Sequence, residues 1–392
     1  MDAPLDPTPT PIAPSLLQRT TLVRETARSC GLPIVAITSA EPFRDLAPFL
    51  REHVAAGRVE GLPWFTEQRA MESLDPATIH PGPRSIVSVG LPYHVPDTGM
   101  PEDGVPRGRI ARYARGEDYH RVLRQRMDHF VEVLSERLGQ EIVSRRVTDT
   151  ARMVDRAVAA RAGLGWYGKN ACIIVPGHSS WVVLGEIVLD LELAHDLPLA
   201  MDCGRCTICI DRCPTGAITA PYTIDSRRCL SFHTIEQRGA IPREIRPLLG
   251  DWVFGCDVCQ DTCPWSGAAR EAADTVFTPR SIANAYPDLG WLVRMSEEEF
   301  REAYRGTPVI RAKRRGLARN AAVALGNAQH DQAEAHLLHA LAHHDEPLVR
   351  LHAAWALSRH PGRSASAALE RARTSDPEPD VRDEAAWALE TR

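Results

Sequence analysis

The feature that most constrains this chain is a group of eight cysteines between residues 203 and 263. The group opens with the run C-x2-C-x2-C-x3-C-P over residues 203–214. In this spacing, three thiolates hold one [4Fe–4S] cluster and the fourth cysteine ligates a second cluster. A shorter run, C-x2-C-x3-C-P over residues 256–264, lacks one cysteine, and Cys229 stands between the two runs to supply it. The spacing predicts a ferredoxin-like module with two [4Fe–4S] clusters.

The crossover between the two runs assigns every cysteine of this group to a cluster. The expected ligand sets are Cys203, Cys206, Cys209 and Cys263 for one cluster, and Cys213, Cys229, Cys256 and Cys259 for the other. Zinc is the alternative, but runs that end in C-x3-C-P do not have the spacing of zinc ribbons. Cys30 and Cys172 lie outside the group and are expected to be small buried apolar residues.

The first 14 residues bear on the compartment in which these cysteines act. They hold five prolines and two aspartates, and they lack the basic start and apolar stretch of a secretory signal. We therefore expect a disordered leader over residues 1–14, a cytoplasmic chain and no disulfide framework. No apolar run approaches the roughly 18 residues of a membrane-spanning helix, so no membrane partner is expected. The net charge of −5 argues against a wholly basic nucleic-acid coat.

The remaining residues divide into three regions, and the predicted fold class is α+β with several domains. Residues 15–195 alternate helical and strand-like patterns, which predicts an α/β domain with a central sheet. In this domain we expect helices over 16–30 and 117–138, strands over 34–38 and 85–89, and a hairpin that turns at 176–179. The cluster module follows over residues 196–280, and a helical domain over residues 281–392.

The helical domain contains an internal repeat of 32 residues. The sequence Ala-Ala-x-Ala-Leu begins at Ala321, Ala353 and Ala385. Small residues at fixed helical positions let neighbouring helices approach closely, so the repeat predicts a short HEAT-like solenoid. The alternative is an alanine-rich bundle whose spacing is chance, and three copies in register make it the weaker interpretation.

Two clusters conduct single electrons, so a further cofactor is needed at which those electrons do chemistry. No G-x-G-x-x-G follows a strand and no Walker lysine loop is present, which disfavours dinucleotide and nucleotide sites. A flavin or a corrinoid remains. Asp118-Tyr-His120 begins like a cobalt-ligating D-x-H motif, but the glycine expected after it is absent. His120 is therefore expected to be a helix-face residue.

Several long stretches of the chain resemble the epoxyqueuosine reductase family, cobalamin-dependent enzymes of the last step of queuosine synthesis in tRNA. The resemblance runs from about Leu16 to the repeats. It rests on both cysteine runs and on the stretches 112–120, 149–150, 155–159, 163–170, 255–265 and 319–327. Many unrelated enzymes share the ferredoxin run, whereas the combination in this order is specific to the family.

The resemblance implies a reaction and a proton donor. Cobalamin would bind between the first domain and the cluster module, base-off and without a protein ligand to cobalt. The two clusters would reduce its cobalt. It would then drive the conversion of epoxyqueuosine to queuosine in the anticodon loop, with two electrons and two protons. Asp149 would be the proton donor, and burial beside an apolar macrocycle would raise the pKa of its carboxyl toward neutrality. The alternative role of Asp149 is a helix N-cap.

The same resemblance implies which segments border the corrinoid. The matching residues are Arg112, Asp149, Lys169, Asn170, Ile173, Leu184, Leu230, Ser231 and Gly255. Lys169 and Asn170 follow a glycine-rich turn that could let backbone approach a large ligand. The alternative to a corrinoid contact is that Lys169 and Asn170 lie in a turn that faces solvent.

A basic segment stands at the opening of the repeats. Six arginines and lysines fall between residues 305 and 319 of an overall acidic chain, and such a face can neutralise phosphates. A solvated helix face is the ordinary alternative, and the resemblance favours RNA. The expected tRNA-binding residues are Gln237, Arg238, Lys313, Arg314, Arg315 and Arg319. A modified base must also leave its stack to reach a buried cofactor.

Three functions remain open at this point. The first is the reductase that acts on tRNA carrying epoxyqueuosine, supplied with electrons by a low-potential donor of the flavodoxin or ferredoxin type. The second is a corrinoid iron–sulfur enzyme for a small molecule, such as a reductive dehalogenase, which would need neither repeats nor a basic segment. The third is an electron carrier or repeat-built interaction protein without catalysis. No coiled-coil or apolar helix stripe demands a second subunit, so a monomer is expected.

Overall fold

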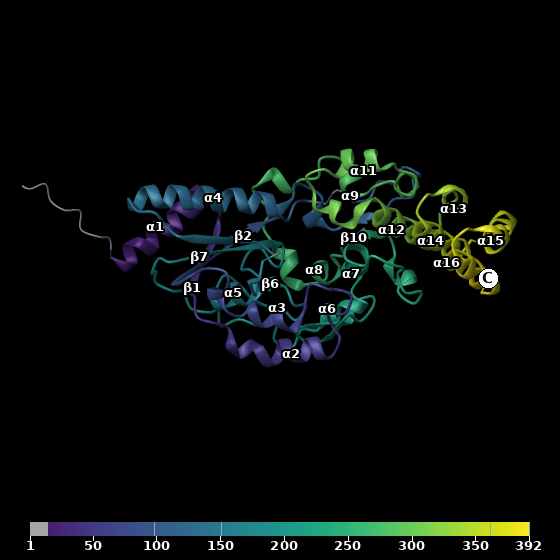
Figure 1. The fold of residues 1–392 in the computed structure, drawn as a ribbon. Helices are drawn as coiled ribbons and strands as arrows, with labels where there is room; N and C mark the ends of the chain where they lie inside the picture. The colour runs from purple at the N-terminus through teal and green to yellow at the C-terminus, as the bar shows by residue number, and fades with distance from the viewer. Residues whose placement is uncertain (1–14, 98, 150, 361, 392) are drawn as a thin grey trace, which may run out of the picture.

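The structure, a computed structural model, describes residues 15–97, 99–149, 151–360 and 362–391. Figure 1 shows an elongated molecule with a sheet at one end, the C-terminal helices at the other and the cluster module between them. The leader predicted over residues 1–14 lies outside the described residues. No helix in the described ranges is long and apolar enough to cross a membrane.

The central sheet has four strands in the order β1-β2-β7-β4, and every neighbouring pair is antiparallel. The strands are β1 (Ile34–Ser39), β2 (Ser85–Pro92), β4 (Ser144–Val147) and β7 (Val182–Leu189). Parallel βαβ units, which define an α/β domain, are thus not used in this sheet. The first domain was predicted to be α/β, and the structure corrects this class to α+β, because its helices do not connect parallel strands.

Helices cover both faces of this sheet, so its central strands are apolar on both sides. The helices α1 (Leu16–Ser29) and α4 (Tyr119–Leu138) lie on one face, and α5 (Asp155–Arg161) lies on the other (Figure 1). Ile187 of β7 packs with Phe130 of α4 on the first face. Val188, one residue further, packs with Val158 of α5 on the second face. Successive strand residues point to opposite faces, which explains this alternation.

Local signals in the sequence set the ends of the two long helices. Ser15 and Gln18 form a capping box at the start of α1. Asp118 caps α4 by accepting a hydrogen bond from the backbone N–H of His120, and α4 ends at Gly139 with a left-handed φ of 63°. Both helices match the predicted ranges 16–30 and 117–138 to within two residues.

The predicted hairpin at residues 176–179 is wrong in its strand pairing. The turn forms and closes with one bridge between Val175 and Ser179. However, β6 (Ile173–Ile174) pairs with β5 (Trp166–Tyr167), while β7 joins the central sheet beside β2. The apolar runs identified two strands correctly, but their partners come from more distant parts of the chain.

The cluster module is built from short elements around its cysteines. Its helices are α6 (Ile208–Asp211), α7 (Leu230–Ile235) and α8 (Val258–Asp261), and its strands are β8 (Ile218–Ala220), β9 (Thr223–Ile224) and β10 (Trp252–Phe254). The helices α6 and α8 contain the third cysteine of the first run and the second cysteine of the second run, and they contact each other. Strand β10 pairs in parallel with β3 (Arg109–Ile110), which joins the module to the first domain.

The remaining helices form the C-terminal repeats. They are α12 (Lys313–Asn327), α13 (Ala333–His343), α14 (Pro347–Leu357), α15 (Arg363–Ser375) and α16 (Pro379–Glu390). Ahead of them lie α9 (Ile282–Ala285), α10 (Leu289–Leu292) and α11 (Glu297–Tyr304), while α2 (Ala47–Ala55) and α3 (Glu67–Glu72) belong to the first domain. Ala321, Ala353 and Ala385 are fully buried where α14 packs against α12 and α16. The repeated alanines therefore permit the close helix packing that the 32-residue interval predicts.

One apolar core runs from the cluster module into the repeats. It includes Leu230 of α7, Val253 of β10 and Leu317 of α12, and it extends to Ala388 of α16. The module and the repeats are packed as a single body, and this fixes the first repeat helix against the cysteine loops.

Candidate functional site

A cavity of about 380 Å³ lies where the first domain meets the cluster module. Most of its wall comes from the first domain, namely from loops, β6, β7 and the first turns of α4 and α5, and α8 supplies the rest. Among the residues that line it are Tyr113, Tyr119, Asp149, Ile173, Leu184 and Gln260. Gln260 follows Cys259 directly, and its side-chain oxygen accepts a hydrogen bond of 3.0 Å from the hydroxyl of Tyr93. The cavity therefore borders the cysteine group.

Asp149 presents its carboxyl group to this cavity. Its side chain is 63% exposed, and its backbone has a left-handed φ of 51°. The hydroxyl of Tyr119 donates to Asp149 Oδ2 at 2.7 Å, and Nε2 of His120 lies 3.5 Å from the same oxygen. The N-cap alternative is wrong, because α5 begins at Asp155 with Val154 as its cap residue.

His120 was expected on an ordinary helix face, and the structure gives it a specific partner instead. Its Nδ1 lies 2.8 Å from Asp118 Oδ1, which leaves Nε2 directed at Asp149. Burial alone would lower the pKa of His120, but hydrogen bonds to Asp118 and Asp149 outweigh it and raise this pKa to about 9. The imidazole is therefore protonated at neutral pH.

The rise in the pKa of Asp149 that is expected beside a bound macrocycle stays a prediction, and the surrounding protein residues alone act in the opposite direction. The hydrogen bond from His120 lowers the pKa of Asp149, burial opposes this, and the hydrogen bond from Tyr119 lowers the pKa further. The pKa of Tyr119 is raised by burial and by the Asp149 charge, so its hydroxyl keeps its proton. The proton of this group accordingly resides on His120 at neutral pH, beside an ionised carboxylate.

The eight cysteines of the cluster module fall into two neighbourhoods. All ten cysteines of the chain are free thiols in the described structure. Burial raises the pKa of Cys209, and the thiols that add to this effect are those of Cys203, Cys263 and Cys206. Burial likewise raises the pKa of Cys256, to about 12, and its thiol neighbours are Cys229 and Cys213. Cys259 has Cys229 and Cys256 among its neighbours. These neighbours are compatible with the two expected ligand sets, and the assignment of each cysteine to a cluster stays a prediction.

No group of three or more His, Cys, Asp or Glu side chains in the described ranges is arranged to hold one metal ion. Cys172, which was expected to be a buried apolar residue, lies between the cavity and the cysteines. It lines the cavity, and burial raises the pKa of its thiol to about 11, with Cys229 and Cys209 nearby.

Three of the predicted corrinoid-bordering residues line this cavity, namely Asp149, Ile173 and Leu184. Lys169 and Asn170 reach the cluster module instead. The Lys169 ammonium donates to the carbonyl of Gly204 at 2.7 Å, and the Asn170 amide donates to the carbonyl of Cys259 at 3.3 Å. The solvent-facing alternative for this turn is therefore wrong, since both side chains join the two domains.

Arg112 also joins the two domains. Its backbone N–H donates to Asp257 Oδ2 at 2.8 Å, and its guanidinium pairs with Asp261 and stacks 4.9 Å from the ring centroid of Trp181. These partners hold the side chain at the domain junction, although its buried Nε has no hydrogen-bond partner among the described residues. Arg112 is not among the described residues that line the cavity.

The remaining predicted contacts are not among the described residues that line the cavity, namely Leu230, Ser231 and Gly255. Leu230 is 2% exposed within the core. Gly255 has a φ of 69°, and a Cβ atom there would lie 2.5 Å from the Cβ of Ala111. Glycine is needed at this position for the close packing of β10 on the first domain.

The predicted tRNA-binding residues form two different groups. Arg238, Lys313 and Arg315 are exposed. Gln237 is half-buried beside Arg238, and the Arg314 side chain is 12% exposed and pairs with Asp345 at 2.5 Å.

Arg319 requires a correction, because it is 1% exposed. Its guanidinium donates to the carbonyls of Gln237 at 2.7 Å, Gly239 at 2.8 Å and His233 at 2.6 Å. These bonds use its donors inside the protein. Arg319 therefore shapes the loop that carries Gln237 and Arg238, and the structure offers RNA no access to it.

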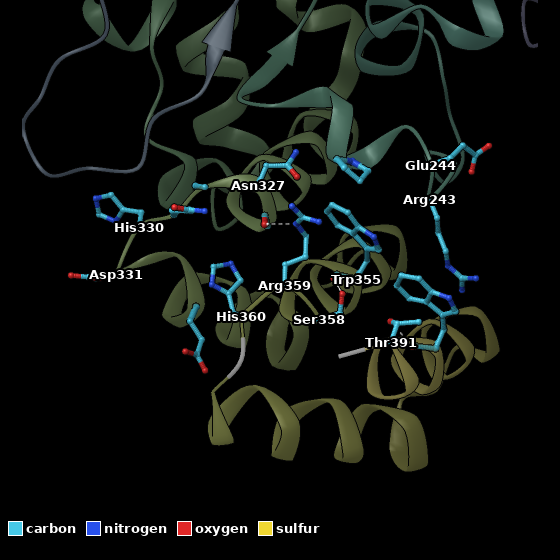
Figure 2. A pocket seen from close by; sticks show the side chains of 16 residues that line it. Arg243, Glu244, Asn327, His330, Asp331, Trp355, Ser358, Arg359, His360 and Thr391 are labelled. Atoms are coloured by element: carbon cyan, nitrogen blue, oxygen red, sulfur yellow. Dashed lines mark hydrogen bonds between the residues drawn. The ribbon is translucent and has the colours of Figure 1, made fainter. Parts of the chain in front are cut away.

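A larger cavity of about 1090 Å³ lies among the repeats, away from the cysteines (Figure 2). It is an open groove between the loop at Arg243 and the helices α12, α14 and α16. The Arg243 guanidinium lies 4.4 Å from the ring centroid of Trp387 in its wall. None of the predicted cofactor or catalytic residues lines it in the described chain, so the smaller cavity at Asp149 is the candidate site.

Comparisons with known proteins agree with this organisation. Family models described as "Epoxyqueuosine reductase QueG", "4Fe-4S double cluster binding domain" and "HEAT repeats" match residues 74–150, 202–266 and 309–390. An epoxyqueuosine reductase of Xanthomonas campestris is 39% identical over 86% of this chain and 95% of its own length. That of Pseudomonas aeruginosa is 37% identical over 86% of this chain and 93% of its own length.

Solved structures show the same similarity over nearly the whole chain. The crystal structure of an epoxyqueuosine reductase with an epoxyqueuosine-modified tRNA stem loop has a TM-score of 0.88 and 29% identity, and the match covers 94% of this chain and 97% of that one. The enzyme of Streptococcus thermophilus gives a TM-score of 0.85 at 26% identity, with coverage of 94% and 97%. Taken with the curated relatives, these matches show that the chain belongs to the epoxyqueuosine reductase family.

Proposed function

We propose that this chain converts epoxyqueuosine to queuosine in the anticodon loop of tRNA. The observation that carries the proposal is the position of Asp149, whose carboxyl faces a cavity that α8 of the cluster module closes on one side. A proton source and an electron source thus face one cavity. The overall reaction takes up two electrons and two protons, releases the epoxide oxygen as water and leaves a carbon–carbon double bond. The relative solved with a modified tRNA stem loop supports tRNA as the substrate.

The residues present fit a corrinoid at this cavity. Ile173, Val182 and Leu184 form an apolar wall, which suits the face of a macrocycle. A cavity of about 380 Å³ is at the small end of ligand sites, so it would enclose only part of a corrinoid. When bound, cobalamin would supply the low-valent metal chemistry that opens the epoxide.

The side chains around Asp149 hold and orient a proton. Tyr119 fixes one carboxylate oxygen of Asp149, while Asp118 fixes the imidazole of His120 so that Nε2 faces this carboxylate. The Asp149–His120 pair therefore holds one proton at the edge of the cavity. Asp149 delivers it to the departing oxygen, where general acid catalysis contributes about 100- to 10,000-fold to such steps.

The remaining parts of the proposal concern partners. Arg238, Lys313 and Arg315 are among the exposed cations at the opening of the repeats, and Gln237 and Arg314 flank them. They suit the phosphates on either side of an extruded base. A flavodoxin or ferredoxin would supply electrons to the two clusters, and we propose a monomer that acts in the cytoplasm.

Anaerobic reconstitution tests this proposal. The purified chain should bind about eight irons, as two four-iron clusters require, and should take up cobalamin with a change in its visible spectrum. It should then convert epoxyqueuosine in tRNA to queuosine, and tRNA from a strain without the protein should retain epoxyqueuosine. Unchanged queuosine in that strain would remove the tRNA assignment.

The role of Asp149 has its own test. Asp149→Asn should keep both clusters and cobalamin while turnover falls by about 100-fold or more. Asp128→Asn is the matched control, because Asp128 is a 40% exposed carboxylate on α4 that pairs with Arg146 away from the cavity. Full activity in Asp149→Asn would show that another group supplies the proton.

A further inference from the structure

A second carboxylate pair lies behind the wall of the Asp149 cavity. Glu186, on the central strand β7, is 0% exposed. Neither of its carboxylate oxygens receives a hydrogen bond from an N–H or O–H group of the described residues. Its direct cross-strand neighbour is Ser88, whose hydroxyl is likewise buried and without a partner there. A fully ionised carboxylate in such surroundings would be very costly, so the group must be neutralised or paired.

Asp155 connects Glu186 to the cavity. It is the first residue of α5, which packs on β7, and it lines the cavity together with Asp149. One of its carboxylate oxygens, Oδ1, is fully buried and has no donor among the described groups. The carboxyls of Asp155 and Glu186 lie within hydrogen-bonding reach of each other. Two carboxyl groups can form such a bond only when one of them carries a proton.

The charges around this pair favour the shared proton. Burial raises the pKa of Glu186 most strongly, and the negative charges of Asp155 and Asp149 raise it further. Burial also raises the pKa of Asp155, with Asp149 acting in the same direction and Arg156 in the opposite one. The Arg156 guanidinium is engaged elsewhere, since it donates to the carbonyl of Ala171 at 2.8 Å. Asp149 and Arg156 are the charged groups whose fields reach the pair from α5 and from the loop before it.

The stoichiometry of the reaction gives this pair a role. The reaction consumes two protons, and the Asp149–His120 pair holds one. We propose that Asp155 and Glu186 share the second proton and serve as a proton reservoir that recharges Asp149 through the cavity. This inference rests on the proposed function of the cavity.

The transfer is a proton movement alone. The proton leaves the carboxyl pair for the Asp149 carboxylate, which passes it to the departing oxygen. As this proton leaves, solvent that reaches Asp155 through the cavity supplies another proton to the pair, so no buried dianion persists, and electrons arrive by the separate cluster route. A purely structural pair would need no opening to the cavity, whereas Asp155 lines it.

The stored proton can be measured without cofactor or substrate. Infrared difference spectra of the cofactor-free full chain should show the C=O band of a protonated carboxyl at pH 7, and Glu186→Gln should remove it. Glu192→Gln is the matched control, since Glu192 lies just beyond β7 with a 62% exposed side chain and should leave the band intact. A spectrum of the wild type without this band at pH 7 would overturn the reservoir.

The pH dependence of stability gives a second readout. Because the folded state holds a proton that the unfolded carboxyls release above about pH 4.5, the free energy of unfolding should fall as pH rises from there toward the raised pKa. Glu186→Gln should flatten this decline, and Glu192→Gln should not. Equal slopes in the wild type and Glu186→Gln would overturn the inference.

Turnover then separates storage from structure. In Glu186→Gln and Asp155→Asn, turnover should fall by about tenfold, less than for loss of a direct general acid, and the alkaline limb of the pH profile should change while cluster and cobalamin content stay constant. Unchanged pH profiles would contradict the reservoir even if the band were present. If the wild type shows the band but does not act on tRNA, the proposed function fails, and the reservoir role fails with it while the shared proton stands.

Discussion

Replacing Arg319 by methionine distinguishes a structural arginine from an RNA contact. The change keeps most of the aliphatic stem and removes the guanidinium, which donates to the carbonyls of Gln237, Gly239 and His233. An orphaned buried acceptor costs about 1–3 kcal/mol. Three such acceptors at the low end of this range predict a loss of about 3 kcal/mol in the free energy of unfolding.

Thermal unfolding of the reconstituted chain measures this loss. A domain of 150–250 residues shifts by about 2–4 °C per kcal/mol, so the Tm of Arg319→Met should fall by roughly 6–12 °C. Arg315→Met is the matched control four residues away, where the exposed side chain makes one hydrogen bond of 3.3 Å to the carbonyl of Arg238. Its stability should change by less than about 0.5 kcal/mol.

The same two variants are expected to differ in the salt dependence of their RNA binding. Below its Tm, Arg319→Met should retain the salt dependence of tRNA binding, whereas Arg315→Met should reduce the slope of log K against log salt by about 1. A stable Arg319→Met variant with a reduced slope would refute the reasoning, because the buried guanidinium would then have to reach phosphate.

Three further predictions follow from the structure. Cys229→Ser should lower the iron content from about eight to about four atoms per chain, because it removes a ligand of one cluster only; iron analysis and electron paramagnetic resonance would detect the remaining cluster. Lys313→Ala with Arg315→Ala should reduce the salt slope of tRNA binding by about 2, while Arg301→Ala, a 71% exposed control on α11, should leave it unchanged. Activity should fall as pH rises through about 9, where His120 loses its proton. The contribution of the protonated His120 to the free energy of unfolding should be lost as pH rises from about 6.5 to about 9. A flat activity profile across about pH 8–10 would contradict this assignment.

The cysteine sequence predicted most of the cluster module because cluster ligation is a local pattern. One expected cluster takes three of its four ligands from the first short run, the other takes two from the second run, and each run gives its last cysteine to the other cluster. The structure places the thiols of Cys203, Cys206 and Cys209 beside that of Cys263, as this crossover requires. The helical repeat was predictable for the same reason, since the Ala-Ala-x-Ala-Leu sequence recurs every 32 residues.

The site around Asp149 was only partly predictable, because it joins groups that are distant in sequence. Tyr119 and His120 approach Asp149 across 29 to 30 residues, and no periodicity marks that contact. The stretch 112–120 did carry a signal, since it stood out as a specific motif, but His120 gave no indication of its partner. The role of Glu186 was even less predictable from the sequence, because a single charged residue in an apolar strand is ordinarily interpreted as a residue that faces solvent.

Burial explains why Arg319 was assigned wrongly. It belongs to a dense run of cations, and the charge count of such a run cannot tell which side chains face inward. The structure turns Arg319 toward carbonyls of the loop at Gln237, while Lys313 and Arg315 remain exposed. On a helix, successive residues point about 100° apart, so neighbouring cations lie on different faces.

The exposure of Asp149 suggests how proton delivery is coupled to ligand entry. With its side chain 63% exposed and a protonated His120 beside it, the Asp149 carboxyl is ionised at neutral pH and cannot itself donate a proton. A corrinoid and a base that cover it would remove water from it, and desolvation raises the pKa of a carboxyl. The proton would then move from His120 to Asp149 only when the cavity is filled. On the proposals above, the buried Asp155–Glu186 pair is already desolvated, so it can hold its proton before the ligands arrive. The chain would thus separate storage, which needs burial, from delivery, which needs contact with the substrate.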